Sequence, residues 1–225
     1  SLAVFVVSSG IAGAMLADED NNTTGSFMGN TYETQMVAVP PDGADAAMDQ
    51  LLAEGIRLFV IMAEAEDLLR LTKKAAAQDA LVFNTSSAAT PLRDQACNGN
   101  LLHIAPSNQM MTDAVAQFAK WKKWDRWFLI YGSNPSDLAL AESYRRSARK
   151  FGAKITEDRL FQDPGGTRRT DSGHVRVQRQ LPLDTQGASR HDVVIAADAT
   201  DYFARYVSYN RGDPRPGMGS GGLGP

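Results

Sequence analysis

The feature that most limits what this chain can fold into is a regular alternation of short apolar runs with stretches that carry an apolar stripe of helical spacing. Residues 56–62 are apolar almost without interruption over the length of a strand, as expected for a strand covered on both faces. Just before them, Met48, Leu51 and Leu52 have helical spacing, and Gly55 follows where a helix would end. Strands that alternate with helices in this way predict an α/β fold of βαβ units with parallel sheets.

The same two patterns divide most of the chain into predicted elements. Strands are predicted over residues 2–7, 32–39, 56–62, 81–83, 101–105, 127–131, 153–161 and 193–197. Helices are predicted from residue 11 to a stop at residues 21–25, and over residues 47–52, 64–77, 107–123, 134–151 and 200–209. Asn134 is the predicted N-cap of the helix that Gly152 ends, with Pro135 at its first position. Residues 162–173 predict a loop, and residues 211–225 form a tail rich in glycine and proline.

Charge is distributed unevenly along the chain. Residues 1–118 contain 14 acidic and 5 basic residues, a net of −9, whereas residues 119–225 contain 12 acidic and 18 basic residues, a net of +6. The change near Lys120 predicts a first α/β lobe over residues 1–119 and a second, partial lobe over residues 120–225. A basic lobe opposite an acidic one favours an anionic ligand on the second lobe, although incidental surface charge explains the counts equally well.

Signatures of catalysis and of metal binding are weak in this sequence. The three histidines have no metal-ligand spacing with each other or with the single cysteine, and no G-x-S-x-G elbow is present. Residues 217–222 match G-x-G-x-x-G, but they follow no predicted strand and open no predicted helix, as a dinucleotide site requires. We therefore expect neither an enzyme nor a metal site. No apolar run is long enough to cross a bilayer.

The segment Trp121–Trp127 interleaves tryptophans with basic residues, a pattern that nucleic-acid-binding surfaces share. It also ends a predicted helix, where positive charge is favourable, and enters a predicted strand, where the rings can seal the joint. The overall net charge of −3 favours this structural interpretation. We therefore expect no nucleic-acid partner.

Polar side chains follow several of the predicted strands, and the carboxyl ends of the strands are the usual place for a ligand in an open parallel sheet. Such residues occur in both halves of the chain, which predicts a cleft between two lobes. An aromatic ring and loop arginines of the basic half complete the set, because rings stack on flat ligands and guanidinium groups pair with carboxylates. Taken singly, each residue is as well explained by a cap or a surface role. The candidate ligand-binding residues are Glu64, Asn84, Ser86, Ser87, Ser107, Tyr131, Ser133, Asn134, Arg168, Arg169, Asp198, Thr200, Arg211 and Arg215.

With its elements in this order, the chain resembles the type 1 periplasmic binding proteins, the branched-chain amino acid receptor class of ABC transporters. Gly10–Gly29 (GIAGAMLADEDNNTTGSFMG) is similar to the first helix and following turn of that family, and Phe83–Arg93 (FNTSSAATPLR) is similar to its binding loop. Five strings resemble a subgroup encoded with dehydrogenases that depend on pyrroloquinoline quinone (PQQ). These strings are DNNTTGSFMG, WKKWDRWFLI, RRTDSGHV, LDTQG followed by DVVIAAD, and RGDPRP.

The resemblance implies two Rossmann-like lobes, a periplasmic location, and a monomer that closes on a small anionic ligand. For the subgroup it implies PQQ as a bound ligand rather than a catalytic cofactor, with an ABC transporter permease or a PQQ-dependent dehydrogenase as partner. Family members continue beyond the equivalent of Pro225, so we expect the chain to be incomplete at its C-terminus. Three alternatives remain open: a receptor for an amino acid or another small organic acid, a ligand-sensing domain, and a flavodoxin-like or Rossmann-like enzyme.

Overall fold

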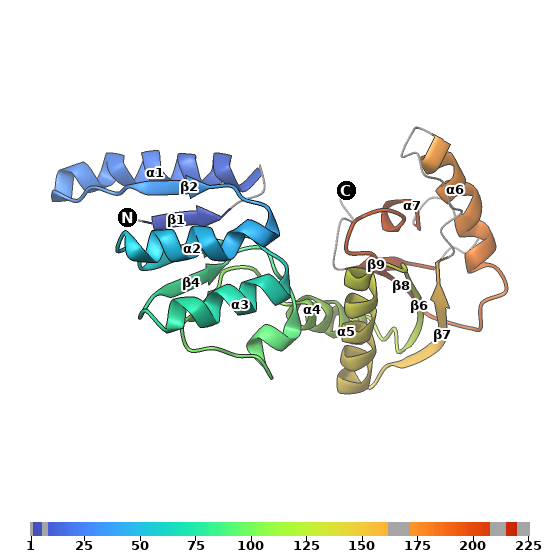
Figure 1. The fold of residues 1–225 in the computed structure, drawn as a ribbon. Coiled ribbons are helices and arrows are strands. Elements are labelled where there is room, and N and C mark those ends of the chain that lie inside the picture. The colour runs from blue at the N-terminus through green and yellow to red at the C-terminus, as the bar shows by residue number, and fades with distance from the viewer. Residues whose placement is uncertain (1, 6–8, 162–171, 208–214, 220–225) are drawn as a thin grey trace. The chain divides into compact units, whose positions relative to one another are not determined.

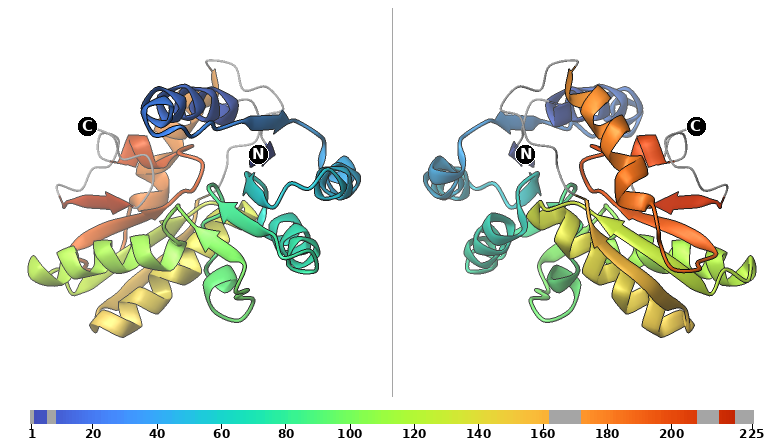
Figure 2. Two further views of the ribbon diagram at one scale, coloured as in Figure 1. Left: turned by 90° about the vertical axis from the view of Figure 1, so that its left-hand side faces the viewer. Right: turned by 90° about the vertical axis from the view of Figure 1, so that its right-hand side faces the viewer.

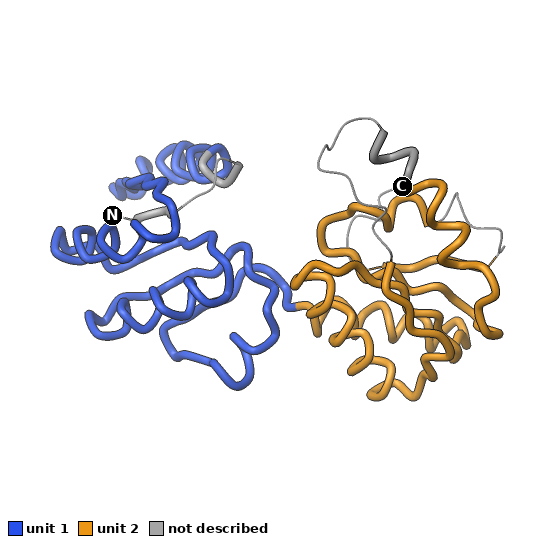
Figure 3. Tube along the Cα trace, turned by 45° about the vertical axis from the view of Figure 1, so that its right-hand side comes forward, with its two compact units in different colours: residues 1–107 blue, residues 108–225 orange. Residues whose placement is uncertain are grey.

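The computed structural model describes residues 2–5, 9–161, 172–207 and 215–219. The chain divides into two compact units (Figure 3). These are residues 1–107 and residues 108–225.

Helix α4 (Asn108–Trp121) accounts for the difference between this division and the boundary at 119/120 that composition suggests. It packs against α5 (Pro135–Phe151) of the second unit, where Gln109 Nε2 donates a hydrogen bond to Ser147 Oγ at 2.9 Å. The acidic-to-basic change in composition therefore falls at the end of α4, whereas the structural division falls at its start.

The first unit contains a five-stranded, fully parallel sheet with the strand order β2-β1-β3-β4-β5. Its strands are β1 (Leu2–Phe5), β2 (Thr34–Val37), β3 (Leu58–Ile61), β4 (Leu81–Asn84) and β5 (Leu101–His103). Its helices are α1 (Ser9–Met28), α2 (Ala44–Ala53) and α3 (Ala65–Ala76), with 3-10 segments at Pro41–Gly43 and Thr90–Arg93 (Figure 1). The direction in which the chain adds strands reverses between β1 and β3.

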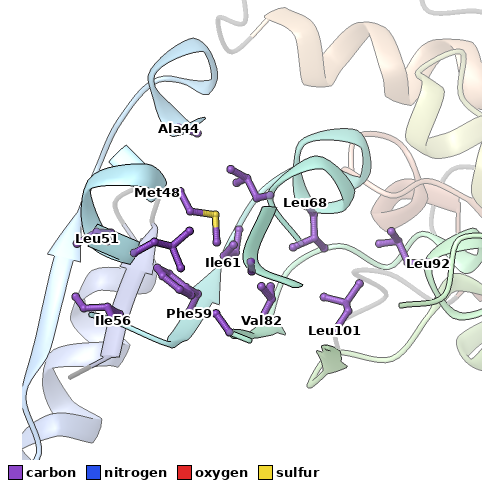
Figure 4. Packing of buried hydrophobic residues seen from close by; sticks show 14 residues of the cluster. Ala44, Met48, Leu51, Ile56, Phe59, Ile61, Leu68, Val82, Leu92 and Leu101 are labelled. Carbon is purple, nitrogen blue, oxygen red and sulfur yellow. The ribbon is translucent and has the colours of Figure 1, made fainter. Parts of the chain in front are cut away.

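One face of this sheet packs against α2 and α3 and forms the core of the first unit (Figure 4). Met48 and Leu51 from α2 meet Phe59 from β3, and all three are fully buried. Gly55 ends the helical region with φ of +88°, a backbone conformation that favours glycine, as its position in the sequence predicts.

The opposite face of the same sheet carries apolar side chains that remain exposed. Leu58 of β3 lies beside Leu81 of β4, and Leu102 of β5 lies beside Phe83. The three leucines are exposed, and Ile104, one residue beyond β5, is 68% exposed. The expectation that residues 56–62 form a strand covered on both faces is therefore wrong for Leu58, although the strand itself is confirmed.

The second unit repeats the topology with a four-stranded parallel sheet in the order β7-β6-β8-β9. Its strands are β6 (Arg126–Tyr131), β7 (Lys154–Leu160), β8 (Val193–Ala197) and β9 (Gly217–Gly219), and its further helices are α6 (Ser172–Thr185) and α7 (Ala204–Val207). Here the order reverses between β6 and β8. The predicted ends of α5 are confirmed, because Asn134 is its N-cap in extended conformation and Gly152 is left-handed at φ of +71°.

Both faces of the second sheet are covered along β6 and β8. Helices cover the sheet on both sides (Figure 2). Trp127 and Leu129 pack with residues of α4 and α5, whereas Phe128 and Ile130 pack with residues of α6 and α7. All residues of β8 are buried. This is the continuous burial that an uninterrupted apolar run predicts for a central parallel strand.

Four elements differ from the sequence-based expectations. Helix α1 continues past the predicted stop at residues 21–25, because Asn22 bonds back to the Asp18 carbonyl at 3.0 Å instead of ending the helix. Helix α6 begins at the end of the predicted loop and continues through residues for which no element was predicted, and strand β9 lies in the predicted glycine-rich tail. Helix α7 begins at Ala204, four residues later than expected, and the predicted loop at residues 162–173 falls mostly outside the described residues. Within the described part of the chain, no helix combines the length and apolarity needed to span a bilayer.

Candidate functional site

The shared topology of the two units indicates where each would hold a ligand. In a parallel sheet of this kind, ligands bind beyond the carboxyl ends of the strands, where the strand order reverses. In the first unit this region includes the loop after β3, with the loop after β4 beside it, while residues 6–8 after β1 lie outside the described residues. In the second unit it includes the loops after β6 and β8. We describe the two edges separately.

Asn84 organises the loop that follows β4. It is fully buried, and its Oδ1 accepts hydrogen bonds from the backbone N–H groups of Ser86 at 3.2 Å and Ser87 at 2.9 Å. Its Nδ2 donates to the Ser87 carbonyl at 2.7 Å and lies 3.0 Å from Nδ1 of His103. The amide is therefore occupied within the protein, and Asn84 positions the loop instead of facing a ligand.

The two serines that Asn84 holds stand at the surface of this edge. Ser86 is exposed and its hydroxyl donates to the Ala63 carbonyl at 3.4 Å, while Ser87 is half-buried. Ala63 precedes Glu64, an exposed residue whose extended backbone begins α3. The structure thus brings the predicted residues Glu64, Ser86 and Ser87 to one edge. Ser107 is buried and is the last residue of the first unit, next to the start of α4.

Arg93 and His103 also belong to this edge, although the pattern of polar residues after strands did not select them. The Arg93 guanidinium donates to the carbonyl of Ala105, just beyond β5. Burial lowers the pKa of His103, and the positive charge of Arg93 lowers it further. His103 is the last residue of β5, is half-buried, and its Nδ1 lies 3.0 Å from Asn84 Nδ2.

Asp137 joins the two loops at the carboxyl edge of the second sheet. It is 2% exposed; its Oδ1 accepts the backbone N–H of Ala199 at 2.7 Å, and its Oδ2 accepts Asn134 Nδ2 at 3.1 Å. The first bond reaches the loop after β8 and the second reaches the loop after β6. From the sequence, Asp137 is recognisable as an acid in the first turn of α5, but its burial and its link across the edge are not.

Gly132 makes room for this carboxylate. A Cβ atom at position 132 would lie 3.0 Å from Cγ of Asp137 and closer still to its Oδ2. Asp137 cannot move away cheaply, because both of its oxygens are engaged. The absence of a side chain at position 132 is therefore part of how the two loops are held together.

Asp198 fixes the loop after β8. It is buried; its Oδ2 accepts the backbone N–H groups of Phe203 at 2.6 Å and Ala204 at 2.9 Å, and its Oδ1 accepts both N–H and hydroxyl of Thr200 at 3.2 Å. Four donors therefore surround the carboxylate, and Asp198 is a structural anchor. Thr200 and Ala199 remain exposed on the loop that it holds.

Three predicted residues lie at the end of β6. Ser133 and Asn134 are exposed in the loop that leads into α5. Tyr131 is half-buried, and the guanidinium of Arg145 stacks 4.9 Å from its ring centroid while forming a bidentate pair with Asp158. One face of the ring is therefore occupied, which limits the stacking of a flat ligand on Tyr131.

Of the four arginines expected to bind an anion, Arg215 lies within the described residues, and it is not at this edge. Arg215 precedes β9 and lies 3.1 Å from Nδ1 of His191, which precedes β8, so it stands at the amino ends of the strands. Arg168, Arg169 and Arg211 lie outside the described residues. Two buried carboxylates, Asp137 and Asp198, lie at the carboxyl edge of β6 and β8, and the loop after β8 also carries Asp201, which pairs with Arg205 of α7.

The Asp137 carboxyl has a distinctive pH dependence. Burial raises its pKa, and the nearby negative charge of Asp198 raises it further, against the lowering effect of its hydrogen bonds. Folding therefore favours the protonated form of Asp137. The stability that protonated Asp137 contributes is fully present below the unfolded pKa of 3.8, and it is lost as the pH rises through the higher pKa of the folded state. We expect the variant Asp137→Asn to gain stability relative to the wild type as the pH rises through this window. Urea unfolding of both proteins across that range tests this, and a pH-independent difference would contradict it.

The chain matches one protein family in sequence and several solved structures in fold. A family model described as periplasmic binding protein matches residues 3–170. The leucine-, isoleucine-, valine-, threonine- and alanine-binding protein of Brucella ovis superposes with a TM-score of 0.67 at 16% identity, over 92% of this chain and 56% of that one. An ABC transporter substrate-binding protein of Desulfitobacterium hafniense gives 0.67 at 14% identity, over 97% and 64%. A solute-binding protein of R. palustris in complex with benzoate gives 0.62 at 12% identity, over 97% and 61%.

At these identities the likeness to the solved structures is one of fold. The chain spans less than two thirds of the length of each of these three proteins. No curated protein matches it in sequence.

Proposed function

Because the chain belongs to the periplasmic binding protein family, we propose that it is the ligand-binding part of a protein that captures a small molecule in the periplasm for an ABC transporter. It acts by binding and releasing its ligand, without chemical turnover. The observation that carries the proposal is that each unit ends its parallel strands in exposed polar loops at or beside the point where the strand order reverses. A ligand bound by the loops of both units would favour a closed state.

The ligand class that we propose is a small molecule with a carboxylate. The Desulfitobacterium hafniense protein has also been solved with Leu, and the R. palustris protein holds benzoate. The subgroup strings favour PQQ, which also carries carboxylates. The hydroxyls of the exposed Ser86 and Ser133 and of the half-buried Ser87, together with the N–H groups at the start of α5, are donors suited to such a group.

A thermal-unfolding screen with leucine, benzoate and PQQ, and with glucose as an uncharged control, tests the proposal. A ligand that binds the folded state adds about 2.7 kcal/mol of stability at 100 times its Kd, so one of the carboxylates should raise the Tm saturably. Native mass spectrometry of the purified protein shows whether a ligand has been carried through purification. No shift with any carboxylate and no carried ligand would contradict the carboxylate class.

The candidate loops are tested with the double variant Ser87→Ala with Ser133→Ala. Loss of both hydroxyls should weaken the ligand identified by the screen about tenfold or more. The matched control is Ser26→Ala, which removes an exposed hydroxyl of α1 and should leave affinity unchanged. Equal effects in the two proteins would place the ligand elsewhere.

A further inference from the structure

An aromatic–basic patch, composed of Phe118, Trp121, Lys122 and Lys123, lies at the C-terminal end of α4. Trp121 is 72% exposed and Phe118 is 43% exposed. Their ring centroids are 5.6 Å apart, and Nζ of Lys122 lies 4.3 Å from the Trp121 ring and 5.5 Å from the Phe118 ring. Apolar rings and a cation therefore form one continuous surface feature.

The other two tryptophans of this segment pack in or against the core of the second unit, whereas Trp121 does not. Trp127 is buried in the core of the second unit, and its Nε1 donates to the Trp124 carbonyl at 2.8 Å. Trp124 is partly buried against the same core and meets Phe118 edge-on at 6.1 Å. The structural role expected for residues 121–127 thus applies to Trp124 and Trp127, whereas Trp121 turns its ring outward.

Lys123 occupies a position where glycine would be more favourable. Its φ of +61° is left-handed; its N–H bonds to the Lys120 carbonyl at 3.0 Å and that of Trp124 bonds to the Ala119 carbonyl at 2.9 Å. These two bonds form the Schellman arrangement that ends many helices and that most often has glycine at this point. A lysine here places a cation in the patch at the expense of backbone strain.

The positive charge of the patch is not neutralised nearby. Lys120 pairs with Asp125 at 2.9 Å, and Arg126 pairs with Asp192. Among the described residues, no acidic side chain pairs with Lys122 or Lys123. The patch therefore has two uncompensated cations beside an exposed indole.

We propose that the aromatic–basic patch docks on an anionic phospholipid surface. Indole rings favour the boundary between water and hydrocarbon, and lysines beside them can bury their alkyl stems while the ammonium groups meet lipid phosphates. Each lysine near an anionic surface adds to binding, and ring insertion adds an apolar contribution. This inference goes beyond the proposed function, because it requires no ligand in either unit. It would keep the protein close to the membrane in which a transporter lies.

The observations favour lipid over nucleic acid or an acidic protein. The patch is small and its charge is concentrated in two adjacent lysines, whereas a long polyanion is bound by cations spread along its length. A lipid interface accommodates both parts of the patch, because an indole ring favours the boundary and the ammonium groups meet lipid phosphates.

Vesicle co-sedimentation of the whole chain provides the test. Binding is expected to vesicles of equal parts phosphatidylcholine and phosphatidylglycerol, to be much weaker with phosphatidylcholine alone, and to fall as salt is added. The variant Lys122→Glu with Lys123→Glu should bind at least about tenfold more weakly. Trp121→Ala should bind several-fold more weakly and should abolish the blue shift of tryptophan fluorescence on binding. The matched control, Lys73→Glu with Arg146→Glu, changes the net charge equally at exposed sites outside the patch and should retain most of the binding.

Lys123→Gly separates binding from folding. Relief of the left-handed strain should move the urea midpoint of the second unit upward, while vesicle binding falls several-fold. The proposal is overturned if the wild type does not bind anionic vesicles, if it binds neutral vesicles equally, or if the control double variant loses as much binding as the patch variant. A ligand-binding defect in the screen above would leave these results unchanged, so the two proposals fail independently.

Discussion

The substitution Asp198→Ala is expected to lower the free energy of unfolding of the second unit by about 3–4 kcal/mol. Asp198 is buried, and its two oxygens satisfy the backbone N–H groups of Thr200, Phe203 and Ala204 as well as the Thr200 hydroxyl. Removing the carboxylate leaves these donors without their acceptor and leaves a cavity at the end of β8. Because the same loop presents Thr200, ligand affinity should fall as well.

Tryptophan fluorescence is well suited to this measurement, since all three tryptophans lie in the second unit. Urea unfolding followed at the indole signal therefore reports that unit. Asp198→Asn keeps one acceptor oxygen and should be intermediate. The control Glu142→Ala removes an acidic group that is half exposed, and should change stability by less than about 0.5 kcal/mol. A change of that small size in Asp198→Ala would show that its hydrogen bonds are not needed.

Gly132→Ala is the second substitution with a large expected effect, a loss of about 2–4 kcal/mol. The added methyl group would overlap the Asp137 carboxylate, whose oxygens are held by Ala199 and Asn134. Either the carboxylate or the strand end must shift, and both loops of this edge then lose their common anchor. Circular dichroism during urea unfolding measures the loss, with Gly99→Ala as the control, because a Cβ there meets nothing within 4 Å.

A double-mutant cycle identifies the cause. In the background Asp137→Ala the methyl group has room, so the second substitution should cost far less than it does in the wild type, with a coupling of at least about 1 kcal/mol. Additive losses would mean that the two positions act independently.

The fold was predictable in its main elements because burial leaves a clear pattern. The run at residues 193–197 and the caps of α5 at Asn134 and Gly152 gave correct positions, since a fully buried strand and a helix end each depend on local chemistry. Helix α6 and strand β9 depend instead on packing against a distant sheet. Their own composition, with Pro182 inside the helix and glycines in the strand, argues for loops.

The positions of the polar residues at the strand ends were predictable from the sequence, but the hydrogen bonds that those residues make were not. Polar residues after parallel strands do gather at one edge of each sheet, as Ser86, Ser133 and Thr200 show. Asn84 and Asp198 belong to the same pattern, yet both are used to hold loops. The pattern cannot separate side chains that hold a loop from those that the loop presents, because both follow a strand. Arg215 was expected among the ligand-binding residues, but it lies at the amino ends of the strands. The sequence did not predict the strand at residues 217–219, and it is that strand which determines the end of the sheet where Arg215 lies.

The uncovered face of the first sheet has a consequence for how this polypeptide behaves at high concentration. The neighbouring apolar side chains of Leu58, Leu81 and Leu102 are exposed to water, and Ile104 continues this apolar surface beyond the end of β5. Surfaces of this kind attract one another, so molecules should cluster through this face before either unit melts. Colloidal behaviour in concentrated samples would then be set by the first unit, even though the second contains all of the tryptophan signal by which unfolding is followed.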